Sequence, residues 1–232
     1  MRIGLVGVGH LGKIHLRCLL KTKFIVEGFF DTNQEVSDQI ATEYNVKAFR
    51  DFDSMLDAVD CIDIVSPTVF HFEIAKKAII KGKHIFIEKP LTETTEQARE
   101  LVSLAIKYNV IVQVGHVERY NPAIRSMSGV KFNPKFIEGH RLAMFNPRGT
   151  DVSVVLDLMI HDLDIILSLI KSEVKNVSAN GVCIVSNTPD ICNARIEFVN
   201  GSVANLTASR ISLKNMRKIR IFQDDATSVW TF

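Results

Sequence analysis

The feature that most constrains the fold is a glycine pattern directly after the first apolar run of the chain. Residues Gly7-Val8-Gly9-His10-Leu11-Gly12 follow the run Ile3–Val6 and precede a helical pattern. In a strand–helix turn of this kind, Gly7 permits the tight bend, Gly9 lets a ligand approach the backbone, and Gly12 lets the helix pack on the strand. The G-x-G-x-x-G pattern in this context therefore predicts a βαβ unit that cradles a pyrophosphate.

The first half of the chain continues this alternation of strands and helices. Short apolar runs end in glycine, proline or acidic residues, and amphipathic segments lie between them, which is typical of a parallel, doubly wound sheet. Right-handed crossovers place the carboxyl ends of such strands on one edge, where ligands bind. The predicted strands are 3–6, 24–30, 46–49, 61–65, 84–87 and 110–114; the predicted helices are 11–20, 35–44, 72–81 and a last one that Thr92 or Thr94 caps and that runs to Tyr108.

The pattern changes after Asn121-Pro122. One long helix, 154–170, accompanies strands expected at 135–143, 175–185, 191–198, 202–209 and 218–222. Asn200-Gly201 between two of them indicates a hairpin. The sequence thus predicts an α/β protein with a Rossmann domain over 1–118 and an α+β domain over 119–232 whose sheet is mostly antiparallel.

Composition excludes several classes of protein. The 28 Lys and Arg nearly balance the 26 Asp and Glu, so the net charge of +2 does not indicate a protein that binds nucleic acid. No apolar run reaches the roughly 18 residues of a membrane span, and Met1 leads straight into a strand rather than into a signal peptide. Cys18, Cys61, Cys183 and Cys192 lack metal-ligand spacing, so no metal site and a reducing cytoplasm are expected.

The predicted cofactor is a nicotinamide dinucleotide. The amino end of a helix offers free N–H groups and partial positive charge to phosphates, which makes His10 and Leu11 candidate contacts beside the three glycines. Asp31 closes the second strand, where a carboxylate accepts hydrogen bonds from the adenosine ribose. It would repel a 2′-phosphate, so NAD is favoured and NADP stays possible. The alternative is a glycine turn without a ligand.

A polar stripe crosses the otherwise apolar helix of the second domain. Asp157, His161, Asp164 and Ser168 recur at helical spacing and share one face. An imidazole one turn after a carboxylate is suited to acid–base chemistry, because the carboxylate orients it and supports its charged form. The stripe could equally face solvent while the other faces pack.

Three motifs together resemble the glucose–fructose oxidoreductase/inositol dehydrogenase (Gfo/Idh/MocA) family: the glycine loop, Glu88-Lys89-Pro90 after the fifth strand, and Asp157-x-x-x-His161-Asp162 on the helix of the second domain. Their order and spacing match along essentially the whole chain. The resemblance implies that Lys89, Asp157 and His161 line an active site. It also implies that further residues contact the cofactor, namely Ser66, Pro67, Thr68, His71 and Glu88.

The resemblance extends to a subgroup of that family, the UDP-N-acetylglucosamine 3-dehydrogenases, through segments 115–122, 146–151 and 158–162. It implies reversible NAD(P)-dependent oxidation of a secondary hydroxyl of a sugar, with His161 as general base and Lys89 as hydrogen-bond donor to the same oxygen. Asp157 would hold either Lys89 or His161 in position. Side chains that could hold the substrate, by charge for a diphosphate or by stacking on a base, are Arg119, Tyr120, Arg141, Asn146 and Arg148.

The resemblance also implies a homo-oligomer built through the open face of the second sheet. Two alternatives remain. One is a non-catalytic NAD(P) sensor, which the intact Lys89, Asp157 and His161 disfavour. The other is a truncated and inactive chain, because family members usually continue further and later strands of the second sheet could be missing.

Overall fold

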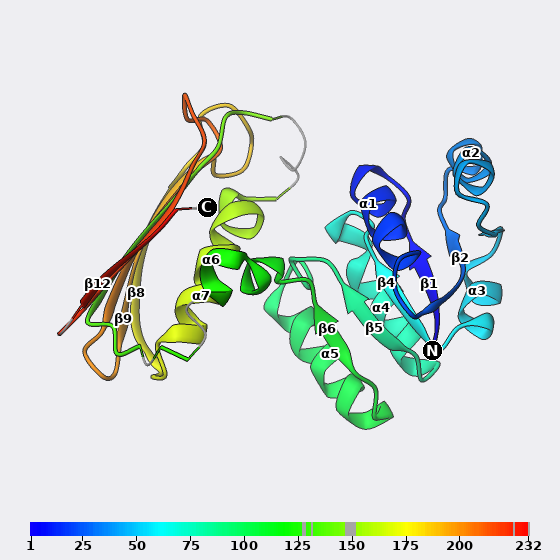
Figure 1. The fold of residues 1–232 in the computed structure, drawn as a ribbon, viewed down its shortest axis with the longest axis horizontal. Coiled ribbons are helices and arrows are strands. Elements are labelled where there is room, and N and C mark those ends of the chain that lie inside the picture. Colours follow the sequence, from blue (N-terminus) through cyan, green and yellow to red (C-terminus); the bar gives the residue numbers. More distant parts are fainter. Residues whose placement is uncertain (127–128, 131, 147–151, 225, 232) are drawn as a thin grey trace. The chain divides into compact units, whose positions relative to one another are not determined.

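A computed structural model describes residues 1–126, 129–130, 132–146, 152–224 and 226–231. The chain divides into two compact units, Met1–Gly115 (unit 1) and His116–Phe232 (unit 2), and each is described by itself (Figure 1). The boundary expected after residue 118 falls three residues later than this division, inside a short 3-10 helix, Val117–Tyr120 (η2).

Unit 1 contains a six-stranded, fully parallel sheet with the strand order β3-β2-β1-β4-β5-β6. This order confirms the Rossmann prediction. The order reverses between β1 and β4, so the crevice at their carboxyl ends is the place where such sheets bind ligands. The strands are β1 (Arg2–Val6), β2 (Ile25–Phe30), β3 (Ala48–Phe49), β4 (Cys61–Ile64), β5 (His84–Ile87) and β6 (Val112–Val114).

Helices cover both faces of this sheet. Leu16 of α1 and Ile40 of α2 pack with Leu5 and Phe29 in one apolar core, whereas α3, α4 and α5 contribute to a second core against β4 and β5. Thr94 caps α5 in a capping box with Gln97. The helices are α1 (His10–Leu19), α2 (Gln34–Tyr44), α3 (Phe52–Ala58), α4 (His71–Ile80), which follows the 3-10 turn η1 (Thr68–Phe70), and α5 (Thr95–Tyr108).

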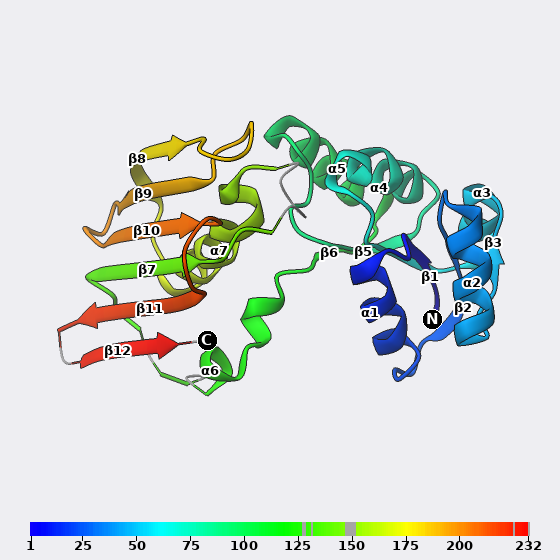
Figure 2. The same ribbon diagram turned by 90° about the horizontal axis from the view of Figure 1, so that it is seen from above.

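Unit 2 contains a six-stranded sheet in the order β12-β11-β7-β10-β9-β8, seen strand by strand in Figure 2. All neighbouring strands are antiparallel except β7 and β10, which are parallel, so the prediction of a mostly antiparallel sheet is confirmed. The elements are η2, α6 (Pro122–Arg125), β7 (Phe136–Leu142), η3 (Val155–Met159), α7 (Ile160–Leu169), β8 (Val174–Val182), β9 (Ile191–Phe198), β10 (Val203–Ser209), β11 (Met216–Gln223) and β12 (Ala226–Thr231).

One face of this sheet packs on α7 and forms the core of unit 2. Ile165 and Ile166 belong to the same buried cluster as residues of the sheet such as Ala194 and Leu206. The helix expected over 154–170 is present, but its first turn is a π-helix, η3, and α-helical geometry begins at Ile160. π-turns inside helices are frequent at functional sites, and this one carries Asp157.

A buried ion pair fixes the start of that helix. The carboxylate of Asp190 accepts the N–H groups of Ile184, Val185 and Ser186, and Arg210 Nε donates to it at 3.0 Å. These backbone donors hold the pKa of Asp190 well below its usual range. Arg210 also donates to the carbonyl of Val152, so the β8–β9 connection holds the segment that leads into η3.

Among the described residues, no helix is both long enough and apolar enough to cross a membrane.

Candidate functional site

A cavity of about 600 Å³ opens at the carboxyl edge of the sheet of unit 1. Four segments line it: the glycine loop and the start of α1, the end of β2, the turn after β4, and the start of α4. It therefore lies at the switch point of the sheet, where dinucleotides bind. The lining residues are Val6, Gly7, Gly9, His10, Leu11, Phe30, Asp31, Thr32, Val65, Ser66, Pro67, Phe70, Glu73 and Ile74.

The glycine loop is shaped to receive phosphate groups. Gly7 has φ of +91°, a left-handed conformation that favours glycine. A Cβ on Gly9 would meet no atom within 4 Å, so the backbone is open to the cavity at this residue. Gly9 precedes α1, and no side chain caps the first turn of that helix. Its N–H groups are therefore available to an anion, and the loop fits a pyrophosphate.

Asp31 is held against this loop. Its Oδ2 accepts the N–H of Val8 at 2.8 Å, and its Oδ1 accepts the N–H of Asn33 at 2.9 Å. An ionised carboxylate offers about four acceptor positions, so two remain for the hydroxyls of a ribose. Glu73 from α4 lines the same cavity and adds a second carboxyl group that sequence reasoning missed.

Four predicted cofactor contacts do not line the cavity. Gly12 is buried beneath the carbonyl of Gly7, and Thr68 is buried. The ring nitrogens of His71, which is 1% exposed, lie 2.9 Å from the carbonyl oxygens of Ser66 and Pro90. Glu88 is also buried. None of these four residues is part of the wall of the cavity, and a direct contact with the cofactor stays a prediction for each.

Sequence reasoning missed a cluster of ionisable groups behind the glycine loop. His15 of α1 lies between Asp63 of β4 and Glu88 (Nδ1–Oδ2 2.9 Å, Nε2–Oε1 3.3 Å). Burial disfavours charge on the imidazole, but the hydrogen bonds that its ring N–H groups donate to both carboxylates, together with the negative charge of these carboxylates, outweigh burial and raise the pKa of His15 to about 10. The only sequence signals are an acid inside the apolar run of β4 and a histidine one turn after Gly12.

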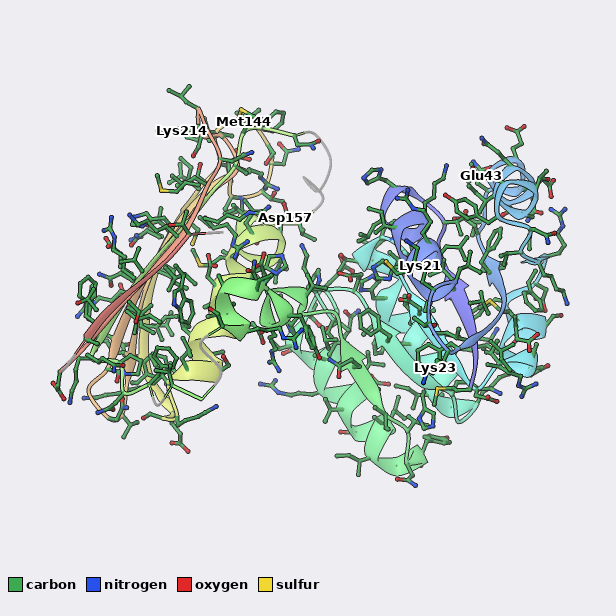
Figure 3. The ribbon with its side chains drawn as sticks, in the orientation of Figure 1. Lys21, Lys23, Glu43, Met144, Asp157 and Lys214 are labelled. Carbon is green, nitrogen blue, oxygen red and sulfur yellow. The ribbon has the colours of Figure 1, made fainter. Side chains whose placement is uncertain are left out.

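In unit 2, Asp157 lies on η3 (Figure 3) and His161 on the first turn of α7, both partly buried. The polar stripe proves to be mixed. Asp164 accepts two hydrogen bonds from Arg119, at 2.7 and 2.6 Å, whereas Ser168 is exposed. Asp164 is thus a structural anchor for η2, and Asp157 with His161 remain as the acid–base candidates of this helix.

Arg141 is buried rather than presented to a ligand. Its side chain is 3% exposed; Nη2 donates to Asp162 at 2.7 Å and Nη1 to Glu118 at 3.2 Å. Burial raises the pKa of Asp162 although Arg141 opposes this effect. The other predicted substrate contacts Tyr120 and Asn146 are exposed, and Arg148 lies outside the described residues.

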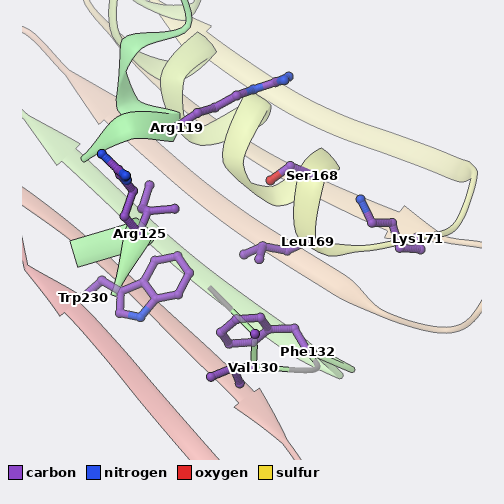
Figure 4. A pocket seen from close by; sticks show the side chains of 10 residues that line it. Arg119, Arg125, Val130, Phe132, Ser168, Leu169, Lys171 and Trp230 are labelled. Atoms are coloured by element: carbon purple, nitrogen blue, oxygen red, sulfur yellow. The ribbon is translucent and has the colours of Figure 1, made fainter. Parts of the chain in front are cut away.

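A second cavity, of about 410 Å³, lies within unit 2 (Figure 4). Trp230 and Phe132 meet edge to face with ring centroids 5.7 Å apart and form an apolar wall. Arg119 lines this cavity together with two cations that sequence reasoning missed, Arg125 and Lys171. Within the described part of the chain, no group of three or more His, Cys, Asp or Glu residues is placed to hold a metal ion.

Comparison with known proteins agrees with this architecture. Residues 1–116 match a family described as "Oxidoreductase family, NAD-binding Rossmann fold", and residues 124–228 match the GFO/IDH/MocA C-terminal domain. The chain belongs to the Gfo/Idh/MocA oxidoreductase family. Its N-terminal unit is accordingly an NAD-binding Rossmann domain, and the cavity beside the glycine loop is the candidate cofactor cavity of this domain.

Several members of the family are similar to this chain. It is 41% identical to the UDP-N-acetylglucosamine 3-dehydrogenase of Acidithiobacillus ferrooxidans over 97% of its own length and 72% of the relative. It is 28% identical to the scyllo-inositol 2-dehydrogenase of Bacillus subtilis, with 91% and 68% covered. A solved structure of the Acidithiobacillus enzyme superimposes with a TM-score of 0.94 at 40% identity, covering all of this chain and 74% of that one.

Proposed function

We propose that this oxidoreductase oxidises a secondary hydroxyl of a UDP-linked amino sugar, of the UDP-N-acetylglucosamine type. The observation that carries the proposal is the 41% identity to a UDP-N-acetylglucosamine 3-dehydrogenase over 97% of the chain. The cofactor cavity supports the proposal, because a dehydrogenase needs its dinucleotide and its catalytic side chains at the same edge of the sheet. Lys89 comes two residues after the end of β5, at that same edge.

In the proposed reaction, His161 removes the hydroxyl proton and Lys89 donates a hydrogen bond to the oxygen as negative charge develops on it. Asp157, one turn before His161, orients the imidazole and favours its protonated form. Bound NAD⁺ supplies the acceptor for the hydride that leaves the carbinol carbon. The alcohol loses one hydride and one proton and becomes a ketone.

The diphosphate of the substrate requires positive charge and hydrogen-bond donors. Among the predicted contacts, Arg119 and Asn146 reach solvent and are the primary candidates, and Tyr120 offers a ring for stacking. Arg148 is retained as a candidate from its charge alone. Arg141 is proposed to act indirectly, by holding Asp162 on the helix that carries His161.

Turnover and binding measured side by side test this function. UDP-N-acetylglucosamine is incubated with NAD⁺ and the NADH absorbance band is followed, while NADH binding is measured by fluorescence. Lys89→Ala and His161→Ala should each lower kcat by about 10²–10⁴-fold while NADH still binds. Full activity in either variant would refute its role. Binding of NADH without turnover of any UDP-sugar would point to a sensor instead.

We further propose a cytoplasmic homo-oligomer that associates through the face of the second sheet opposite α7. Alternate residues of β9 such as Asn193 and Arg195 face away from the core and are exposed, and β8 is exposed along its whole length. Light scattering coupled to gel filtration measures the mass. We expect the wild type to have a mass above that of one chain and Arg195→Glu to have a lower mass. A monomeric wild type would contradict the proposal.

A further inference from the structure

The turn Glu88-Lys89-Pro90 is held by a histidine on each side of the lysine. On the Glu88 side, His15 Nε2 lies 3.3 Å from Glu88 Oε1, and its other nitrogen lies 2.9 Å from Asp63 Oδ2. His15 belongs to α1, the helix whose first residues line the cofactor cavity. The imidazole therefore links the phosphate-binding helix to the carboxyl ends of both β4 and β5.

The two carboxylates around His15 are nearly excluded from solvent, with side chains 5% and 10% exposed for Asp63 and Glu88. Two buried carboxylates in one cluster repel each other unless a cation lies between them. Asp63 Oδ1 has no hydrogen-bond partner among the described residues, so His15 is the partner that the structure gives this side chain. The raised pKa of His15 agrees with an imidazolium that donates to both carboxylates.

Glu88 passes this restraint to the backbone of Lys89. Its Oε2 accepts the N–H of Lys89 at 3.2 Å, so the carboxylate contacts both the imidazole and the peptide group from which the lysine side chain starts. Gly115, after β6, closes the other side of the carboxylate: a Cβ there would lie 2.7 Å from Glu88 Oε1. Any larger residue at this position would displace Glu88.

His71 restrains the other side of the lysine. This residue begins α4, and its ring nitrogens lie 2.9 Å from the carbonyl oxygens of Pro90 and Ser66. Ser66 lines the cofactor cavity. The residues before and after Lys89 are thus each attached, through a histidine, to a segment that forms the wall of that cavity.

We propose that His15 and His71 are positioning residues that fix the backbone on both sides of Lys89 and hold it in register with the cofactor cavity. The inference rests on the proposed role of Lys89 in catalysis. Neither histidine touches substrate in this scheme. Their effect on the rate is indirect, because a displacement of about 1 Å in a catalytic group can cost about 10²-fold.

Two variants perturb the His15 side by different means. His15→Gln removes the imidazole, and Gly115→Ala displaces Glu88 without removing any charge. His84→Gln is the matched control: His84 begins the same strand, β5, is also partly buried, and accepts the N–H of Ile111 at 3.0 Å, but at the opposite end of the strand.

His15→Gln and Gly115→Ala should lower kcat for UDP-N-acetylglucosamine by about tenfold to a hundredfold, with the NADH dissociation constant within about threefold of wild type. His71→Gln should lower kcat and also weaken NADH binding, because it releases Ser66. His84→Gln should leave both constants unchanged. A residue with only a structural role would shift the melting temperature without this separation of kcat from binding, and that result would overturn the proposal.

Exchange of the Lys89 amide, followed by NMR, tests the restraint without turnover. We expect faster exchange in His15→Gln and Gly115→Ala and the wild-type rate in His84→Gln. Wild-type exchange in both test variants would overturn the proposal even if the enzyme is active. If the wild type turns over no UDP-sugar but these exchange rates respond as expected, the proposed function fails while the restraint on Lys89 stands.

Discussion

Two glycines of one loop should respond to the same substitution in opposite ways. Gly9→Ala adds a methyl group that faces open space, whereas Gly12→Ala adds one that would lie 2.0 Å from the carbonyl oxygen of Gly7 and 2.8 Å from its carbonyl carbon. We predict that Gly9→Ala retains wild-type stability and loses NADH affinity. Gly12→Ala, in contrast, should lose stability first.

The geometry sets the magnitudes. Non-bonded heavy atoms pack at about 3.5 Å or more, so α1 and the loop must separate by roughly 1.5 Å in Gly12→Ala. Overpacking of this kind costs about 1–3 kcal/mol, which lowers the melting temperature by about 2–12 °C at about 2–4 °C per kcal/mol. Gly9→Ala should stay within about 0.5 kcal/mol of wild type. Its methyl group occupies the approach to the pyrophosphate, so NADH affinity should fall at least about tenfold.

Calorimetry of the cofactor-free protein and fluorescence titration with NADH measure the two effects separately. Melting is compared without nucleotide because bound NADH would itself raise the melting temperature. Wild-type NADH affinity in Gly9→Ala would refute the assignment of this loop as the pyrophosphate cradle. An unchanged melting temperature in Gly12→Ala would refute the packing argument.

Three further outcomes are expected. Asp31→Ala should weaken NADH binding and narrow the preference for NADH over NADPH, measured as the ratio of dissociation constants; an unchanged ratio contradicts the ribose assignment. His15 has a folded pKa of about 10 against an ordinary 6.5, so its stabilising contribution is complete below about pH 6.5 and disappears as the pH rises through about 10. The difference in melting temperature between wild type and His15→Gln should therefore shrink as the pH rises from about 6.5 to about 10. A difference that does not change with pH would contradict a charged imidazole. Asp162→Ala should cost about 3 kcal/mol in urea unfolding because it removes the acceptor of Arg141 Nε and Nη2 and leaves only Glu118 to balance this buried charge, whereas Glu138→Ala, which breaks the partly exposed pair with Arg220, should cost about 1 kcal/mol or less; equal losses would contradict the role of burial.

The order of strands and helices could be predicted because it is encoded in local patterns. Apolar runs that end in glycine, proline or acidic residues located the strands of the first sheet, and Asn200-Gly201 located the hairpin between β9 and β10, where Gly201 has φ of +86°. The short helix α3 was missed because seven residues give too little periodicity to read. A π-turn at 155–159 could not be foreseen, since a single turn barely changes the spacing of apolar residues.

The partners of charged side chains could not be predicted, because contacts between distant segments leave no local pattern. Arg141 was expected to contact substrate on its charge alone. Side chains of β7 point alternately to the two faces of its sheet, and Arg141 lies on the same buried face as Ile137, where it contacts Asp162. The position of Arg141 four residues after Ile137 was the signal in the sequence that could have predicted its burial. His15 and Asp63 are 48 residues apart, and only the folded sheet brings them together.

The position of β7 in the second sheet has a consequence for synthesis of the protein. This central strand ends at Leu142, but its parallel partner begins at Val203, 61 residues later, and its antiparallel partner begins at Met216. A ribosome adding about 5–20 residues per second leaves β7 without neighbours for several seconds, while the nucleotide-binding half is already complete and able to fold. Nascent chains should therefore acquire NADH affinity before they acquire protease resistance in their second half. Between these two events β7 lacks its neighbouring strands, and we expect chaperones to bind the chain mainly in this interval.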